Sequence, residues 1–338
     1  MRKIFAGMLF CGLLLCGCGE KPAPESSAET VPETTTAAAT TATVSETESE
    51  TTSETVTTAP PEQLYMNRCE KQIVEVQPDE ILERREDAVY PEFEKYYYYS
   101  HTACRRTGVN VLLPADYTDE KKYPVLYILH GSGDTEDWIA EDRVCVSVML
   151  NNLIADGEAE EMIVVSPYIY CSKDMPECTG LDPENWRNFD RFAEDLMRDL
   201  RPFINSTFSV AEDRAHTAIT GCSAGGRVSL TIGFTHPDVF GFTGAVCPAS
   251  GVVREVSNPP YTLEPAQFCF PENRPYLLLI SAAEHDEAVL DYPYQYHDML
   301  TENGTQHLFH VMTQSGHDYH SVISHLYNFM RMIFRVSE

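Results

Sequence analysis

The sequence predicts an α/β domain with a mostly parallel central sheet and helices on both of its faces. From about residue 95, strand-like and helix-like stretches alternate, as such a sheet requires. The later strand candidates are continuous apolar runs, which is typical of parallel strands covered on both faces. A third observation is the sequence AITGCSAGG at residues 218–226, where a β-branched run stops at a glycine and leads directly into a helical stretch.

Eight segments are strand candidates because β-branched and aromatic residues are concentrated in them. They are residues 97–104, 108–114, 123–131, 162–170, 215–221, 242–250, 275–283 and 307–314. Between Phe189 and Phe203, apolar residues recur at three- and four-residue steps, which predicts an amphipathic helix. Residues 287–303 and 319–334 are further expected helices, whereas the charged segment 63–94 stays unassigned.

The first 17 residues are typical of a bacterial export signal. Arg2 and Lys3 precede an apolar run of about fourteen residues, which is too short to span a bilayer. The sequence LCGC at residues 15–18 resembles a lipobox, in which cleavage before a cysteine accompanies its acylation. We therefore expect residues 1–17 to be a lipoprotein signal peptide and Cys18 to carry the lipid. Ordinary secretion with cleavage elsewhere is the alternative.

Residues 18–62 are rich in Thr, Glu, Ser, Ala and Pro and have almost no aromatic residues. Such a composition buries too little apolar surface to offset the entropy of ordering. We expect a disordered tether with a reach of roughly 35–40 Å, followed by one domain over residues 63–338. The expected location is the outer face of a bacterial cell membrane, with membrane contact only through the lipid anchor.

The charge balance excludes nucleic acid as an expected partner. The chain has 52 acidic and 24 basic residues, a formal net charge of −28, and such a surface repels phosphate backbones. Eight of the 11 cysteines follow the signal segment, an even number that permits disulfides in an exported protein. Cys171 and Cys178 could close the loop CSKDMPEC, but several others lie in apolar runs that suit buried thiols, so the pairing stays open.

Ser223 is the candidate nucleophile. Residues 221–225 read Gly-Cys-Ser-Ala-Gly between a strand candidate and a helical stretch, the arrangement of a nucleophile elbow. Small neighbours allow the tight turn, and the free N–H groups at the start of the helix point toward the same place. The G-x-S-x-G pattern alone is a weak signal, so its position between strand and helix carries the prediction. Cys222 is a rival nucleophile, but the elbow projects its central residue.

A serine hydroxyl needs a base to take its proton and a carboxylate to orient that base. In this arrangement both are expected downstream of the serine, with the acid first. The strand candidate 275–283 is followed by the sequence EHDE, and the strand candidate 307–314 is followed by SGHD. We choose Asp286 and His317. Glu284 is the alternative acid, because a shift of one residue changes which side chain faces the site.

The oxyanion of an attacked ester needs about two backbone donors. The N–H of Ala224, directly after the nucleophile, is one expected donor. The loop HGSGDTEDW supplies the other, with Gly131 or Ser132 nearest to the site. Trp138 and Trp186 could line the cleft, although a lone tryptophan also suits the core.

The H-x-x-H stretches at residues 307–310 and 317–320 do not predict a metal site. Positions three apart on a strand point to opposite faces, and no H-E-x-x-H motif or cysteine ligand cluster accompanies them. His310 lies inside a strand candidate, where we expect it to pack or to form hydrogen bonds. We therefore expect neither a metal nor another cofactor.

Several of these segments resemble the esterase D-like branch of the α/β-hydrolases, particularly bacterial feruloyl and acetylxylan esterases and the esterase modules of xylanases. They are YPVLYILHGSGDTEDW, ITGCSAGGRVSLTIGFTHPDVF, the acid after PYLLLISAA, and SGHDYHSVISHLYNFMRMIF. The resemblance covers residues 95–334 and implies an α/β-hydrolase fold with Ser223, His317 and Asp286 as the triad. Position 319 is a tyrosine, whereas many relatives have a tryptophan there. This difference concerns the acyl or sugar pocket more than the catalytic chemistry.

These observations and the resemblance predict a serine carboxylesterase that removes feruloyl or acetyl groups from plant cell-wall polysaccharide such as xylan, through an acyl-enzyme. A siderophore esterase and a surface acyltransferase are alternatives on the same fold, whereas a cytosolic formylglutathione hydrolase conflicts with the export signal. A non-catalytic glycan-binding lipoprotein is an alternative from another class, which the complete Ser, Asp and His order disfavours. A peptidase would need a propeller or lid domain that the sequence does not indicate.

Overall fold

A computed structural model describes residues 59–338 except 142, 257–259 and 337–338. The expected signal peptide, Cys18 and nearly all of the expected tether lie outside the described residues. Helix α1 (Pro61–Glu70) begins two residues before the expected start of the domain. No helix in the described part has both the length and the apolar character needed to cross a bilayer.

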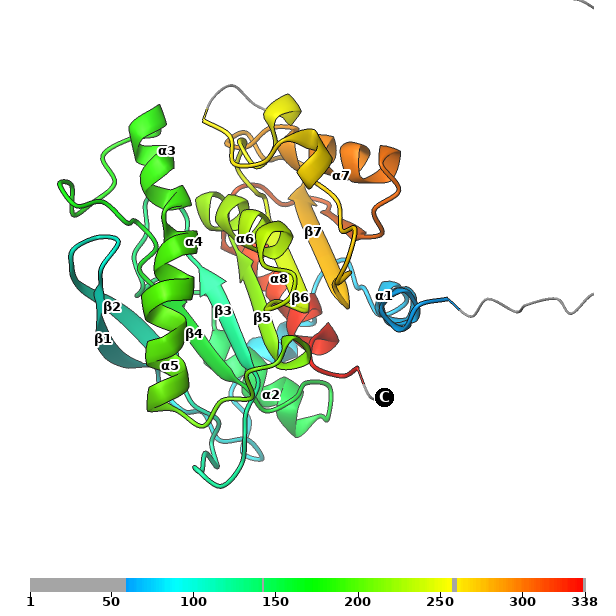
Figure 1. Ribbon diagram of the computed structural model, residues 1–338. Coiled ribbons are helices and arrows are strands. Elements are labelled where there is room, and N and C mark those ends of the chain that lie inside the picture. The colour runs from blue at the N-terminus through cyan, green and yellow to red at the C-terminus, as the bar shows by residue number, and fades with distance from the viewer. Residues whose placement is uncertain (1–58, 142, 257–259, 337–338) are drawn as a thin grey trace, which may run out of the picture. The chain divides into compact units, whose positions relative to one another are not determined.

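The described residues form one eight-stranded sheet with the order β1-β2-β4-β3-β5-β6-β7-β8 (Figure 1). The strands are β1 (Glu94–Ser100), β2 (Arg105–Leu112), β3 (Val125–Leu129), β4 (Ile163–Pro167), β5 (Thr217–Gly221), β6 (Phe242–Val246), β7 (Leu277–Ala283) and β8 (Leu308–Met312). Strands β1 and β2 pair in the antiparallel sense, as do β2 and β4, and every pairing from β4 to β8 is parallel. The eight strand candidates and the mostly parallel sheet are confirmed, with strand ends that differ by a few residues.

Helices cover both faces of this sheet (Figure 1). On one face lie α3 (Pro183–Asp190), α4 (Phe192–Asp195), α5 (Arg201–Thr207) and α6 (Ala224–Thr235). On the other face lie α2 (Val146–Ala155) and α8 (Tyr319–Met332), and α7 (Tyr292–Glu302) follows β7. The expected helix between Phe189 and Phe203 is divided among α3, α4, a π-helical turn at Leu196–Leu200 and α5.

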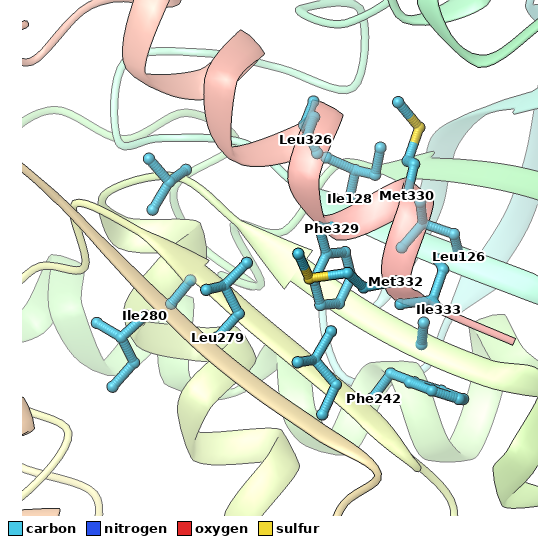
Figure 2. Close-up of a cluster of buried hydrophobic side chains, with 14 of the residues drawn as sticks. Leu126, Ile128, Phe242, Leu279, Ile280, Leu326, Phe329, Met330, Met332 and Ile333 are labelled. Carbon is cyan, nitrogen blue, oxygen red and sulfur yellow. The ribbon is translucent and has the colours of Figure 1, made fainter. Parts of the chain in front are cut away.

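Strand β3 separates the two hydrophobic clusters that hold the layers together. Its side chains alternate, so Tyr127 and Leu129 pack in the cluster beneath α3 to α5, whereas Leu126 and Ile128 pack beneath α8 (Figure 2). Every residue of β3 is buried, which explains its continuous apolar sequence. Full burial of each such side chain stabilises the fold by about 1.5–3 kcal/mol.

The unassigned segment 63–94 packs against the C-terminal helix. Tyr65 on α1 donates a hydrogen bond to the carbonyl oxygen of Met332 at 2.5 Å. The side chain of Asn328 accepts from the N–H of Val74 at 3.0 Å and donates to its carbonyl at 2.8 Å. The segment 63–94 is rich in charged residues, but a few buried contacts hold it against the domain.

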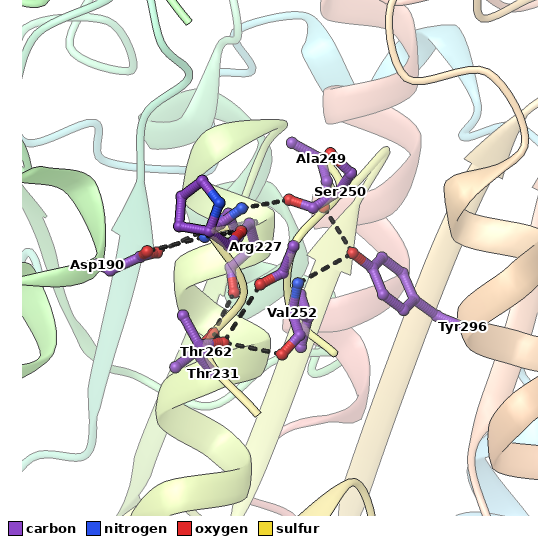
Figure 3. A network of polar contacts seen from close by, with 10 residues as sticks. Asp190, Arg227, Thr231, Ala249, Ser250, Val252, Thr262 and Tyr296 are labelled. Atoms are coloured by element: carbon purple, nitrogen blue, oxygen red, sulfur yellow. Dashed lines mark hydrogen bonds and ion pairs between the residues drawn. The ribbon is translucent and has the colours of Figure 1, made fainter. Parts of the chain in front are cut away.

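Buried Arg227 ties α6 to its surroundings (Figure 3). Its guanidinium donates to both carboxylate oxygens of Asp190 at 2.9 and 2.8 Å and to the carbonyl oxygen of Ser250 at 2.5 Å. Trp186 covers the guanidinium, with Cζ 5.0 Å from a ring centroid. A Cβ on Gly251, where φ is +96°, would lie 1.7 Å from a guanidinium nitrogen. One side chain thus fixes α3 and the loop after β6 relative to the helix that begins beside Ser223.

In the described part, the cysteines of interest are free thiols: Cys69, Cys171, Cys178 and Cys247. Cys171 is buried and Cys178 is partly exposed, so the disulfide that the sequence permitted between them is not formed. Cys69 and Cys247 are also buried, in agreement with thiols that pack as small apolar side chains.

Candidate active site

The turn between β5 and α6 holds Ser223 in a strained conformation. Its φ of 55° and ψ of −115° lie outside the regions that L-residues ordinarily adopt. Two hydrogen bonds hold it there: its N–H donates to the carbonyl of Val246 at 3.1 Å, and its carbonyl accepts from the N–H of Ala249 at 3.0 Å. The end of β6 and the loop that follows it therefore support the strained turn.

Gly221 and Gly225 are required by the close approach of α6 to β3. A Cβ on Gly225 would lie 2.3 Å from the carbonyl oxygen of Leu129 and 2.6 Å from that of His130. A Cβ on Gly221 would lie 2.6 Å from the backbone of Gly225. Only glycine permits these distances, so the pattern G-x-S-x-G places Ser223 against the loop that follows β3.

His317 and Asp286 form a hydrogen-bonded pair, with Nδ1 and Oδ2 2.7 Å apart. The other oxygen of Asp286 accepts from the N–H groups of Ala288 at 2.9 Å and Val289 at 3.0 Å. Burial raises the pKa of Asp286, but the hydrogen bond with His317 and the N–H of Val289 outweigh it, so that the pKa lies below its ordinary value. The carboxylate therefore stays ionised beside the imidazole.

Glu284, the alternative acid, is exposed, and its backbone N–H donates to Met312. The carboxyl group that contacts His317 is that of Asp286, whose side chain is 2% exposed against 27% for His317. His310 is buried in β8, as expected of a residue inside a strand.

Ser223 and His317 line one open pocket of about 260 Å³. Gly131, Ser132 and Trp138 of the loop after β3 also line it, and Tyr319 and Val322 line it from α8. The hydroxyl of Tyr319 accepts from Arg143 at 3.0 Å, which joins the two walls. Trp186, in contrast, packs on Arg227 and does not line this pocket.

The three expected oxyanion donors lie around Ser223. Ala224 is the first residue of α6, so its N–H has no acceptor within the helix. Gly131 approaches the serine closely, since a Cβ there would lie 3.7 Å from Cβ of Ser223. Ser132 follows it on the pocket wall.

His130 is a site residue that the sequence analysis missed. Its Nδ1 donates to the carbonyl of Gly131 at 2.7 Å, and its Nε2 accepts from the N–H of Ile169 at 3.0 Å. Burial lowers the pKa of His130 to about 4, so the ring is neutral and can accept that bond. Its position between an apolar strand and a glycine loop, in the sequence ILHGSG, was the available signal.

Cysteine chemistry at the site is limited by burial. Burial raises the pKa of the Cys222 thiol to about 12, which disfavours the thiolate that a nucleophile requires.

Three side chains at the site could act as metal ligands. Cys247 Sγ, a carboxylate oxygen of Asp286 and a ring nitrogen of His317 lie within 4.8 Å of one another. In the described residues this is the one group that could hold a metal ion, and its donors would suit zinc. Of the two H-x-x-H stretches, only His317 contributes a donor to this group.

The comparisons with known proteins agree with this geometry. The family described as putative esterase matches residues 100–290. The chain belongs to this esterase family.

A solved ferulic acid esterase from the anaerobic fungus Anaeromyces mucronatus is 31% identical to this esterase, with a TM-score of 0.74, over 79% of this chain and 99% of that chain. The same enzyme has been solved in complex with ferulic acid. The endo-1,4-beta-xylanase/feruloyl esterase of Xylanibacter ruminicola is 26% identical over 52% of this chain and 24% of that protein, so the match spans about a quarter of that relative. The enterobactin esterase of Shigella flexneri shares the fold alone. It is 13% identical, with a TM-score of 0.55, over 72% of this chain and 60% of that chain.

Gly225→Ala should destabilise the protein by about 1–3 kcal/mol and lower its esterase activity, because the new Cβ forces α6 away from β3. Urea unfolding and hydrolysis of p-nitrophenyl acetate measure the two effects. Gly133→Ala is the matched control, since no atom lies within 4 Å of its Cβ, and its free energy of unfolding should change by less than about 0.5 kcal/mol. Equal stabilities of the two variants would contradict the steric role of Gly225.

His130 should make the protein less stable as the pH falls from about 6.5 toward 4. In that range the unfolded chain binds a proton at this histidine and the folded chain does not, so the free energy of unfolding decreases by up to about 1.4 kcal/mol per pH unit. His130→Gln keeps a donor and an acceptor but does not titrate. Urea unfolding at pH 7, 6, 5 and 4.5 should therefore give a shallower pH dependence for the variant, and parallel curves would refute the assignment.

Proposed function

We propose that this protein is a serine carboxylesterase that cleaves feruloyl or acetyl esters of plant cell-wall polysaccharide such as xylan. One observation carries the proposal: strained Ser223 and the Asp286–His317 pair meet at one pocket. The 31% identity to a ferulic acid esterase along nearly its whole length supports the ester class. The xylanase/feruloyl esterase relative supports a polysaccharide substrate.

The proposed reaction proceeds through an acyl-enzyme. His317 takes the proton of Ser223 while Oγ attacks the ester carbonyl, and Asp286 stabilises the resulting imidazolium. The N–H groups of Ala224 and of Gly131 or Ser132 stabilise the oxyanion. The sugar alcohol leaves with the proton from His317, and a water molecule, activated by the same imidazole, then releases the acid and restores Ser223.

The walls of the pocket suit an aromatic acyl group. Trp138 from the loop after β3 and Tyr319 from α8 line the pocket with aromatic side chains, and Val322 adds an apolar contact. At about 260 Å³ the pocket holds an acyl group, while the sugar chain must extend outside it. Feruloyl is therefore the preferred acyl group, and acetyl is the smaller alternative.

Ser223→Ala should lower kcat for methyl ferulate by about 10⁴ or more, and Asp286→Asn by about 10⁴, with the fold retained. Glu284→Gln is the matched carboxylate control and should stay within about threefold of the native enzyme, because its side chain is exposed and does not contact His317. Initial rates on methyl ferulate, acetylated xylan and a catecholate ester measure the effects. An active Ser223→Ala enzyme, or a Glu284→Gln loss larger than the Asp286→Asn loss, would reject the assignment. Exclusive hydrolysis of the catecholate ester would reject the substrate class.

We also propose that the enzyme is a lipoprotein on the outer face of a bacterial membrane. The charged start, the short apolar run and the sequence LCGC support this location. In a bacterial host, Cys18→Ser should abolish incorporation of labelled palmitate and release the protein from the membrane fraction. Cys16→Ser is the control for the neighbouring cysteine, and labelling that persists in the Cys18 variant would overturn the proposal.

A further inference from the structure

Two exposed tyrosines mark the edge of the sheet. Tyr97 and Tyr99 on β1 are 48% and 55% exposed, and no other Phe, Tyr or Trp in the described residues is more than about a third exposed. Their neighbours Tyr96 and Tyr98 point to the opposite face, where their rings contact Phe208 and Phe203 at 5.2 and 6.1 Å. Core packing therefore explains alternate tyrosines of the sequence YYYY and leaves Tyr97 and Tyr99 unexplained.

Arg106 lies on the same face as the two exposed rings. It is the cross-strand partner of Tyr99, and its Cζ lies 4.3 Å from the ring centroid of Tyr97. In the part of the chain that the structure describes, no carboxylate lies within 4.0 Å of its guanidinium. An arginine without an ion pair, on a chain of net charge −28, keeps its N–H donors available to a ligand.

A hollow of about 280 Å³ connects this face to the active-site loop. Arg105, Arg106, Thr135, Glu136 and Tyr168 line it. Glu136 lies over Gly108, the cross-strand partner of Tyr97, because a Cβ on Gly108 would lie 2.2 Å from its carboxylate.

The loop of residues 131–138 forms the boundary between the hollow and the active-site pocket. Gly131 and Ser132 line the pocket, whereas Thr135 and Glu136 line the hollow. The carbonyl of Glu136 accepts hydrogen bonds from Asn110 and Ser166, each at 2.9 Å, which hold the loop on the sheet. Arg106 thus belongs both to the tyrosine face and to the hollow, and the loop of residues 131–138 borders both the hollow and the active-site pocket.

We propose that Tyr97, Tyr99 and Arg106 form a glycan-binding face that holds the sugar chain of the polysaccharide whose ester is cleaved. The inference rests on the proposed function, because a polymer bound with its acyl group in a small pocket must continue over the adjacent surface. Residues two apart on a strand lie about 6.8 Å apart, a separation on the scale of a pyranose residue. Tyrosine rings offer flat apolar surfaces to the C–H groups of sugars, and Arg106 offers donors to their hydroxyl oxygens.

Binding of unesterified xylan to the Ser223→Ala protein tests the face without hydrolysis. Affinity gel electrophoresis or calorimetry should show binding, and adding Tyr97→Ala and Tyr99→Ala should weaken it about tenfold, equivalent to about 1.4 kcal/mol. Tyr97→Phe with Tyr99→Phe preserves the ring surfaces and should stay within about threefold. Lys121→Ala, before the amino end of β3 and away from the active-site loop, is a charge control that should leave binding unchanged.

In the active enzyme, the double alanine variant should lose kcat/KM on feruloylated xylan and keep it on methyl ferulate. Unchanged xylan binding by that variant, or absence of binding by the Ser223→Ala protein, would overturn the glycan face. A second copy of the chain is the alternative occupant of this face. In that case, sedimentation would show that the double alanine variant changes oligomeric state while it still binds xylan. If Ser223→Ala protein binds xylan but the native protein hydrolyses no feruloyl or acetyl ester, the proposed function fails and the glycan face stands.

Discussion

Helix α6 begins so close to the end of strand β3 that no side chain fits between them, and the rest of the site depends on this contact. Gly225 makes it possible, and Ser223 consequently adopts a backbone conformation that an isolated chain would avoid. Other contacts stabilise this conformation: hydrogen bonds from the end of β6 and the loop after it hold the turn, and buried Arg227 anchors the helix. A packed, rigid scaffold thereby keeps the hydroxyl at the carboxyl edge of the sheet.

Burial controls protonation around this serine. Asp286 stays ionised because His317 and backbone N–H groups compensate for its lost solvent, whereas His130 stays neutral because nothing charged compensates for its burial. The neutral ring can then bridge Gly131 and Ile169, which fixes the loop on the far side of the pocket. Burial thus acts on both the Asp286–His317 pair and the loop after β3, with opposite outcomes for protonation.

The loop after β3 also connects the proposed chemistry to the proposed binding of polymer. One half of it borders the pocket, where an acyl group would lie, and the other half borders the hollow beside the exposed tyrosines. Ester hydrolysis needs only the first half, whereas recognition of a long sugar chain needs surface beyond it. The antiparallel edge strand β1 supplies such surface because Tyr97 and Tyr99 are exposed on one of its faces, whereas every residue of the interior parallel strands β3 and β5 is buried.

The sequence by itself determined the strand order along the chain, the elbow at Ser223 and the position of His317, since local periodicity and glycine spacing are written directly in the chain. It favoured Asp286 as the acid but left Glu284 as an alternative, and it assigned no role to His130 or to the segment before β1. Those were decided by tertiary structure, because strand register, burial and contacts between distant residues determine which side chain meets which. A charged sequence such as residues 63–94 hides its few buried contacts, and a histidine's protonation follows from the solvent it loses on folding.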